Sequence, residues 1–447
     1  MAAYYVALII YISVLFIISI FLIRKVLNSF QEYGYCGRSL SIGFVFFTYL
    51  GTWIGGGTLI GLLSQSYSYG ANQYWIIALS CIVEAFFALL FISRIRANNF
   101  KSITDFFAAR FPDNHQIIRI PVTGALLIRN VSMIAMQFSA LSYLLTYVFG
   151  ISRNLALLLV FLVLIAYTVL SGLWGVTITD AFQGILQTVC IVVLVVLTLK
   201  ITGGVNTVES YYITNDNSAF LNLFHTNSKW YEIILYIIAY GAFFLMDDQT
   251  CWERIYASKS DKTAKWGFII PLIVTMLTLI VVSYLGVFQR EIFNGEDLSE
   301  SVLYKFIFDY SANKWMIIVL IGLIAAIMSS ADSFLLTSGV IISEDIVKKF
   351  IIRDISDKEM IFFSRIFILV TGSMAFAFAL NIDDILGLWI TGIGMASIIL
   401  LPGYFLGWIG RRGNAKSALI GMCTGYAYVA CMFFGIIGNG PGYVCIG

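Results

Sequence analysis

The sequence has few charged residues, two histidines and five prolines. Only 12% of its 447 residues are Asp, Glu, Lys or Arg, whereas soluble domains average about 25%. This scarcity excludes an ordinary water-soluble domain. Both histidines, His115 and His225, fall in expected loops, which argues against a histidine-based metal site because such sites draw several imidazoles together.

The cysteines likewise indicate neither a metal site nor a disulfide. The seven cysteines show no paired spacing, and most lie inside apolar runs, where cysteine behaves as a small apolar residue. The sequence therefore predicts neither a disulfide framework nor a zinc site. The formal net charge is only +2. The small excess of basic residues is interpreted as a signal for orientation in the membrane and not as a basic surface patch. No nucleic-acid partner is therefore expected.

Apolar residues dominate the chain, at 60% of the sequence with a mean hydropathy of +0.90. Because about 20 apolar residues cross a bilayer as one helix, the chain is predicted to be an all-α polytopic membrane protein. Twelve spans are expected, near residues 3–23, 42–66, 74–93, 120–149, 154–174, 176–199, 230–252, 267–289, 313–343, 364–380, 384–409 and 417–438. The first span lacks a small-residue cleavage site and is interpreted as a retained helix.

Basic residues distinguish the two sides of the membrane. Most of the 27 lysines and arginines fall in short loops on one side, including Arg24, Arg96, Arg254 and Lys259. Cytoplasmic loops carry such an excess. Both termini are therefore expected to face outward, from a plasma (inner) membrane, and Arg129 is the one basic residue expected within a span.

Two units of five spans are predicted to form inverted repeats, because an odd number of spans separates their matching members. Their leading spans are interrupted, at residues 51–58 and 241–250. Such broken helices indicate a solute site at the bilayer midplane, although glycine also serves close helix packing. The expected division is a preceding helix and inner loop (1–41), a first repeat (42–201), an outer loop (202–229), a second repeat (230–410), and a final helix with the C-terminus (411–447).

A polar cluster lies within the apolar run near residues 313–343. Residues 325–333 place three hydroxyls and the carboxylate of Asp332 at membrane depth. An unpaired polar group costs several kcal/mol in hydrocarbon, so such a cluster faces a cavity or an ion. Its oxygens suit a small hard cation.

Four motifs follow one another along the chain. They are residues 326–330 followed by 343–346, residues 171–183, residues 67–70, and residues 249–254 with 257–260. Over nearly the whole chain they resemble the sodium:solute symporter family, which includes proline, sugar, sialic acid, pantothenate and choline transporters. The resemblance implies a LeuT-like 5+5 inverted repeat with one preceding and one following helix, and Na+ as the coupling ion.

By family position, the sodium site would comprise Gly51, Ile54, Ala326, Ser329 and Ser330. The residues also support this assignment directly. An interrupted helix frees carbonyl oxygens, and the alanine and two serines lie within about one helical turn. The alternative is that the serines only hydrogen-bond across helices or to preceding carbonyls.

Asp180, Asp332 and Ser333 form a candidate site for a second cation, since some family members bind a further sodium with an acid at the Asp180 position. Asp332 and Ser333 follow Ser329 by three and four residues, so they share a helical face. Two carboxylates in one apolar pocket repel unless a cation or proton separates them. The alternatives are proton coupling, or a structural role in which Asp332 caps a helix or pairs with a basic residue.

Family position places Thr58, Ser80 and Asp248 against the solute. Trp53 and the glycines after it resemble the choline branch, where an aromatic ring and an acid suit a quaternary ammonium. These residue types vary with the solute across the family, so they leave its identity open.

Arg129 is the other candidate solute contact. It lies about ten residues into its span, where an arginine requires a partner. Its guanidinium can hold a carboxylate at two points. The alternative is a structural ion pair with Glu84 or Asp180.

These observations predict a sodium-coupled secondary active symporter that imports a small organic solute by alternating access, with a carboxylate-bearing metabolite as the first hypothesis. The alternatives are a proton-coupled carrier on the same fold, a quaternary-amine transporter, and, in a different class, a membrane sensor or channel-like protein. No enzymatic activity is expected. The expected partners are the solute, sodium ions and the lipid bilayer, and a single chain is expected to suffice.

Overall fold

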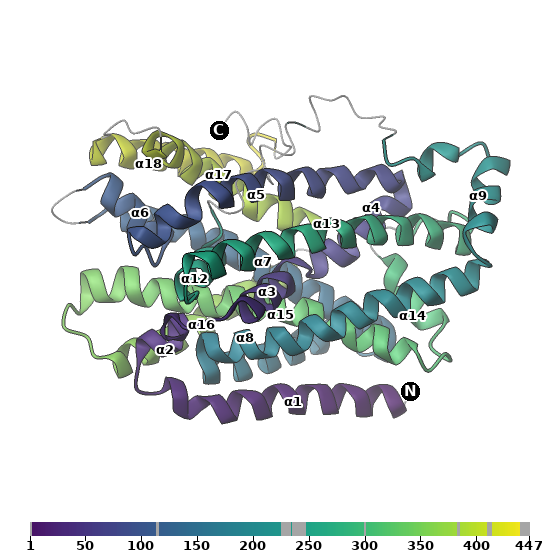
Figure 1. Cartoon of the computed structure of the whole chain (residues 1–447), viewed down its shortest axis with the longest axis horizontal. Coiled ribbons are helices and arrows are strands. Elements are labelled where there is room, and N and C mark those ends of the chain that lie inside the picture. The colour runs from purple at the N-terminus through teal and green to yellow at the C-terminus, as the bar shows by residue number, and fades with distance from the viewer. Residues whose placement is uncertain are drawn as a thin grey trace.

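The computed structural model describes residues 2–112, 116–224, 234, 247–298, 301–381, 385–408 and 414–438. Within these ranges the chain is helical, and extended pairing is limited to one isolated bridge between Leu40 and Ser258. The long helices run side by side along the longest axis of the molecule (Figure 1). The predicted all-α polytopic architecture is confirmed.

Seven of the described helices are long and apolar enough to cross a membrane, and one bent helix pair makes an eighth span. In chain order the elements are α1 (Ala2–Val26), α2 (Phe30–Tyr35), η1 (Cys36–Arg38), α3 (Ile42–Trp53), η2 (Gly57–Gly61), α4 (Leu62–Tyr69), η3 (Ala71–Gln73), α5 (Tyr74–Ala97), α6 (Ile103–Arg110), α7 (Arg119–Phe149), α8 (Arg153–Thr202), α9 (Val205–Thr214), η4 (Ser218–Leu221), α12 (Gln249–Ala257), α13 (Asp261–Ile292), α14 (Val302–Asp309), α15 (Met316–Ile342), η7 (Ser343–Ile351), α16 (Asp357–Asn381), α17 (Ile385–Trp408) and α18 (Ala415–Phe433).

The predicted spans correspond to these helices except near residues 230–252, most of which lie outside the described residues. The second interrupted helix, predicted at residues 241–250, is described only from Asp247 onward, so its break also lies outside. Asp248 is the N-cap of α12, and its side chain accepts a hydrogen bond from the backbone N–H of Thr250.

The two spans predicted near residues 154–174 and 176–199 form α8, which reverses direction within its length. Gly172 has φ 57° and ψ −159°, a conformation that favours glycine. Along α1, the successive contacts of α8 are Tyr167 with Phe16, Ser171 with Ser19, and Gln183 with Tyr11. The contacts first advance along α1 and then return, so the chain turns back at Gly172.

The first interrupted helix breaks between Trp53 and Gly57, inside the predicted range of residues 51–58. Helix α3 continues through Gly51 to Trp53, and the chain resumes as a helix at Gly57 with a bend of 52°. Ile54, at φ −93° and ψ 68°, ends the regular turns. A helix leaves its last carbonyls without intrahelical partners. Because α3 stops here, the carbonyls of Gly51, Thr52 and Trp53 become available inside the protein.

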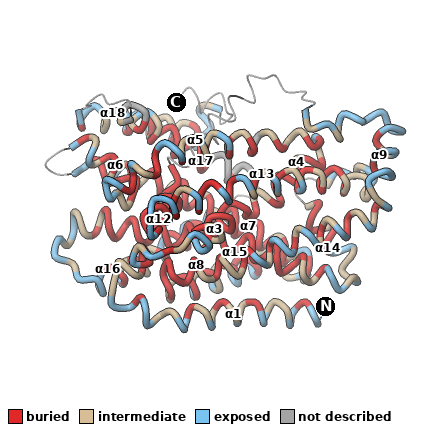
Figure 2. Tube along the Cα trace, viewed as in Figure 1, coloured by how far each residue is buried: buried red, intermediate tan, exposed pale blue. Residues whose placement is uncertain are grey.

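Helix α15 forms the centre of the molecule. Every residue from Val319 to Asp345 is buried, and the buried elements gather around this helix (Figure 2). By contrast, α1 lies at the periphery with exposed apolar residues such as Ile9 and Phe21. A central helix that tolerates polar side chains and a peripheral helix that exposes apolar ones are the arrangement expected in a bilayer.

Candidate cation and solute sites

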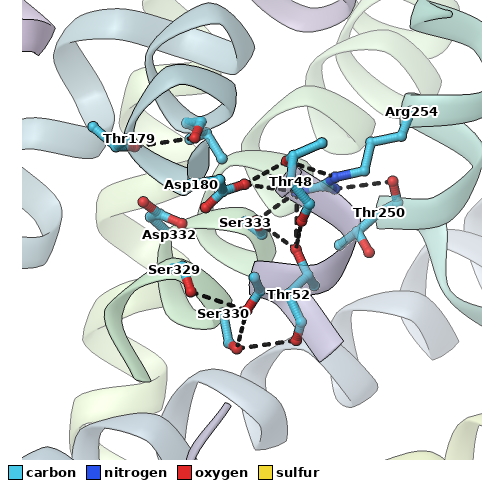
Figure 3. Close-up of polar contacts among 12 residues, drawn as sticks. Thr48, Thr52, Thr179, Asp180, Thr250, Arg254, Ser329, Ser330, Asp332 and Ser333 are labelled. Atoms are coloured by element: carbon cyan, nitrogen blue, oxygen red, sulfur yellow. Dashed lines mark hydrogen bonds and ion pairs between the residues drawn. The ribbon is translucent and has the colours of Figure 1, made fainter. Parts of the chain in front are cut away.

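Two serines of α15 meet the free carbonyls at the end of α3. Ser329 Oγ lies 2.9 Å from the Gly51 carbonyl and 3.0 Å from the Ala326 carbonyl, and Ser330 Oγ lies 3.0 Å from the Thr52 carbonyl. All of these groups are buried, and Figure 3 shows Ser329 and Ser330 beside the α3 segment that carries Thr52. The structure thus brings together Gly51, Ala326, Ser329 and Ser330 of the predicted set. Thr52, which the sequence analysis did not single out, contributes its carbonyl as well, while the fifth predicted residue, Ile54, is the C-cap of α3.

Close approach at this point depends on glycine. A Cβ added at Gly55 would collide with the Ser330 hydroxyl and lie 2.9 Å from Gln137 Nε2, and one added at Gly51 would lie 3.4 Å from Ser329 Oγ. Only a residue without a side chain lets the Gly55 backbone reach α15. Ile54 lies between these two glycines at the bend, fully buried.

Gln137 of α7 supports the break from the other side. Its Oε1 accepts a hydrogen bond of 3.0 Å from the backbone N–H of Gly56, one of the donors that the interrupted helix leaves without an internal partner. Sequence reasoning missed Gln137. A side-chain amide deep within an expected span was the available signal, because buried groups of this kind require hydrogen-bond partners.

The second predicted set, Asp180, Asp332 and Ser333, also comes together, at the level of α3 and α15 (Figure 3). Thr48 Oγ1 donates a hydrogen bond to Asp180 Oδ2. Tyr167 donates a 2.8 Å hydrogen bond to Asp332 Oδ2. Asp180 Oδ1 and Asp332 Oδ1 are buried and accept no hydrogen bond from the described residues.

Arg254 of α12 enters this second set, which corrects the sequence-based assignment of Arg254 to an inner loop. Its Nη2 atom lies 3.5 Å from Asp180 Oδ2 and 2.6 Å from Ser333 Oγ. Nε and Nη2 also donate to the hydroxyls of Thr48 and Thr52, at 3.0 Å each. Arg254 is 1% exposed. The count of basic residues in loops could not reveal that Arg254 is buried, because such a count uses positions along the chain and contains no information on how deep a side chain lies in the protein.

Arg129 is buried against two aspartates. Arg129 Nη2 lies 3.0 Å from Asp248 Oδ2, and Arg129 Nε lies 3.5 Å from Asp247 Oδ1. Ser397 of α17 donates a 2.9 Å hydrogen bond to Asp247 Oδ2. The predicted structural pairing of Arg129 with Glu84 or Asp180 is therefore wrong in its partners, since Asp247 and Asp248 take that role.

Glu84 belongs instead to a chain of hydrogen bonds through the first broken helix. Trp53 Nε1 donates to Tyr49 Oη at 2.6 Å, and Tyr49 Oη donates to Glu84 Oε1 at 2.6 Å. Thr58 Oγ1 donates a 2.7 Å hydrogen bond to the carbonyl of Trp53, the last residue of α3, and so gives that carbonyl a partner. Ser80 is buried on the same helix as Glu84. Glu84 and Tyr49 were not predicted as site residues.

A second charged network closes the end of the molecule where α6 lies. Arg119, at the start of α7, is ion-paired with Asp345 of η7 and with Asp105 of α6. Lys101 is ion-paired with Glu344 at 3.0 Å. Burial is the largest single influence and lowers the pKa of Lys101, but the charge and hydrogen bond of Glu344, together with Tyr256 and Asp105, raise it by more in sum, so the net pKa lies above its usual value. The lysine is therefore protonated at neutral pH.

Gln249 connects this network to α12. Its Oε1 accepts a hydrogen bond of 2.8 Å from the Ile103 backbone N–H, and its Nε2 donates to the Lys101 carbonyl at 3.0 Å. The element that carries Arg254 is thus tied to α6 through Gln249.

A spanning-helix bundle in which a broken helix turns free carbonyls toward hydroxyls of a central helix defines an ion-coupled membrane transporter. The model of the sodium:solute symporter family matches residues 33–425. The chain belongs to this family.

Several curated relatives share most of the chain. It is 25% identical over 415 residues to a high-affinity choline transporter of Caenorhabditis elegans, covering 88% of this chain and 70% of that protein. It is 27% identical to an osmoregulated proline transporter of Bacillus subtilis, covering 84% and 77%. It is 24% identical to the sodium/proline symporter of Escherichia coli, covering 93% and 86%.

Among solved structures, an outward-open, substrate-bound Na+-coupled sialic acid symporter aligns with a TM-score of 0.82, covering 99% of this chain and 95% of that one. At 17% identity this likeness establishes the fold alone. The fold is LeuT-like, as predicted. Family membership makes the protein an integral membrane transporter rather than an enzyme, with Na+ as the coupling ion for symport of a small solute.

Proposed function

We propose that Na+ binds between the first broken helix and α15, at Gly51, Ile54, Ala326, Ser329 and Ser330. The observation that supports this site is the convergence of two serine hydroxyls on the Gly51 and Thr52 carbonyls within 3.2 Å. All of the oxygens are neutral. A hard cation accepts such ligands, and the absence of a fixed charge favours an ion that is released again on the other side.

Transport would proceed by alternating access, in which the first repeat (42–201) and the second repeat (230–410) move relative to each other around the site. The inner network of Arg119 and Asp345 would then close the cytoplasmic side. Both termini would face outward from a plasma membrane, because the excess of basic residues in the loops on one side favours that orientation. A single chain would contain the whole pathway.

For the solute, we propose a small organic molecule with a positively charged amine. The predicted carboxylate hypothesis required a free guanidinium at Arg129, but Asp247 and Asp248 already neutralise that guanidinium. Among the described residues, two aspartates face this one arginine, which leaves one negative charge in excess when all three are ionised. A cationic solute would balance this excess, while a carboxylate would have to displace two aspartates.

Trp53, Thr58 and Ser80 remain the proposed side-chain contacts of this solute, together with Asp248. Trp53 offers an aromatic ring beside the Tyr49 and Glu84 hydrogen bonds. An ammonium group is attracted both to an aromatic face and to a carboxylate. The choline transporter among the relatives is consistent with this choice.

Thermal melting of the purified protein, in sodium or potassium chloride, tests both parts. We expect Na+ but not K+ to raise the melting temperature, and quaternary or protonated amines to raise it further only in Na+. Simple carboxylates and sugars should add nothing. A further shift with carboxylates alone would restore the first solute hypothesis.

Uptake into proteoliposomes separates sodium coupling from the proton-coupled alternative. We expect accumulation of the amine identified by melting to require an inward Na+ gradient. Accumulation driven by a pH gradient in potassium buffer without Na+ would contradict the proposed coupling.

A further inference from the structure

Arg254 provides a fixed positive charge inside the second candidate cation site. Its guanidinium lies among Asp180, Ser333, Thr48 and Thr52, and its Nη1 donates a 3.0 Å hydrogen bond to the Thr250 carbonyl of its own helix (Figure 3). The last contact restricts the direction of the side chain. The guanidinium is therefore positioned by its own backbone as well as by the site.

Arg254 contacts two of the groups that a second cation would use, Asp180 Oδ2 and Ser333 Oγ. A hard cation in this pocket would need the Asp180 carboxylate and the Ser333 hydroxyl. In the structure Ser333 Oγ is 2.6 Å from Arg254 Nη2 and 3.1 Å from Thr52 Oγ1. Asp180 Oδ2 accepts from Thr48 and is ion-paired with Arg254. A sodium ion sharing these oxygens would stand next to a guanidinium, and like charges in an apolar interior repel strongly.

Charge balance leads to the same conclusion. The described charged side chains that meet at this site are Asp180, Asp332 and Arg254, so their combined charge is −1 at most, when both acids are ionised. One sodium ion at the Ser329 and Ser330 site, one helical turn away on α15, is then enough to bring the sum to zero. A second would leave an uncompensated positive charge in a buried region, which is unfavourable.

We infer that Arg254 acts as a tethered cation that replaces a second sodium ion, so that the protein binds one Na+ per chain. The inference rests on the proposed sodium site. It assigns Arg254 as the residue that determines ion stoichiometry, and it explains why the two acids of the cluster coexist with a single ion.

The arginine also connects ion stoichiometry to helix position. Arg254 lies in α12, directly after the second interrupted helix, and Gln249 of the same helix is held by Lys101 and Ile103. Its charge therefore stays in the site only while α12 keeps this position. The second site is filled by the protein rather than by solvent ions in the conformation described.

Equilibrium binding of radioactive Na+ to the purified, solute-free protein tests this inference. The parent chain is expected to bind one ion. Arg254→Gln removes the charge and should expose Asp180 and Ser333 to a second ion, giving two ions per chain. Arg254→Lys keeps a positive charge and should bind one. Arg24→Gln changes an exposed arginine in the last turn of α1, and it should match the parent.

A double variant controls for misfolding of Arg254→Gln, which leaves Asp180 buried without its partner. Asp180→Asn combined with Arg254→Gln removes both charges of the pair, and it should fold and bind one ion. Two ions bound by the parent, or by the double variant, would overturn the tethered-cation inference while leaving the first sodium site intact. No sodium bound by the parent would instead overturn the proposed site, and this inference with it.

Discussion

Arg129 Nη2 of α7 lies 3.0 Å from Oδ2 of Asp248, the N-cap of α12, although the two residues are 119 positions apart in the sequence. Neither side chain is exposed. By the predicted division one belongs to the first repeat and the other to the second, so the ion pair would join the two halves at the centre of the molecule. A charged contact at that place favours one relative position of the halves over others.

Replacing Arg129 should destabilise the protein more than it changes ion binding. Arg129→Ala leaves Asp247 and Asp248 buried without a counter-charge, which costs about 3–5 kcal/mol. We expect a lower melting temperature. Adding Asp247→Asn and Asp248→Asn should restore part of the lost melting temperature. Arg24→Ala is the exposed control. A stable Arg129→Ala protein that binds a carboxylate solute with reduced affinity would support the carboxylate hypothesis instead.

Removing the hydroxyls of Ser329 and Ser330 should weaken sodium binding. Each lost ligand is worth about 1–2 kcal/mol on the scale of polar contacts within membranes, so affinity should fall roughly tenfold per substitution. Sodium titration followed by thermal melting measures this. Ser338→Ala is the matched control, because Ser338 lies on the same helix but contacts Asn130 and Phe334. Equal sodium affinity in all three variants would limit Ser329 and Ser330 to packing.

Adding one methyl group at Gly55 should have a similar effect without removing any ligand. The new Cβ collides with the Ser330 hydroxyl, so either Ser330 or the broken helix has to move. We expect a sodium affinity at least about tenfold lower, since overpacking of this kind costs about 1–3 kcal/mol. Gly43→Ala, on the same helix segment with no atom within 4 Å, should leave affinity unchanged.

Loss of Asp345 should open the α6 end of the protein. Asp345→Asn weakens the buried ion pair with Arg119 and the hydrogen bond from Thr104. Hydrogen exchange of the α6 amides is expected to accelerate, while sodium affinity stays within about twofold. Asp309→Asn is the surface control, since its pair with Lys305 is exposed and worth about 0–1 kcal/mol. Unchanged exchange in Asp345→Asn would show that this pair does not hold the end closed.

The sequence was sufficient for the features that depend on local pattern. Apolar run length predicted the spans, and the spacing of Ser329, Asp332 and Ser333 on one helix placed them together before the structure was known. The interruption of the first helix was predicted from its glycines. The break lies within the predicted residues 51–58, but the residue at which it begins was not predicted, because Gly51 keeps helical geometry and the bend falls at Ile54. Glycine composition indicates where a helix can break, whereas packing against α15 and Gln137 decides where it does.

The partners of buried charges were the part that sequence could not give. Arg254 was assigned to a loop and Arg129 was given the wrong acids, because each pair joins residues far apart in the chain. Charge type and depth in a span show that a partner is needed. Which acid meets which arginine follows from the relative rotation and height of whole helices, and no local pattern encodes that.

At the proposed site, the end of α3 would make sodium binding an exchange reaction. The Gly51 and Thr52 carbonyls already accept hydrogen bonds from Ser329 and Ser330, so an arriving ion would have to turn those hydroxyl protons away before it gained the same oxygens. The sodium affinity would then be the difference between coordination and hydrogen bonding, and we expect it to be modest because both terms are of comparable size. On release the hydrogen bonds would form again, so the ion could leave without the two helices losing their contact.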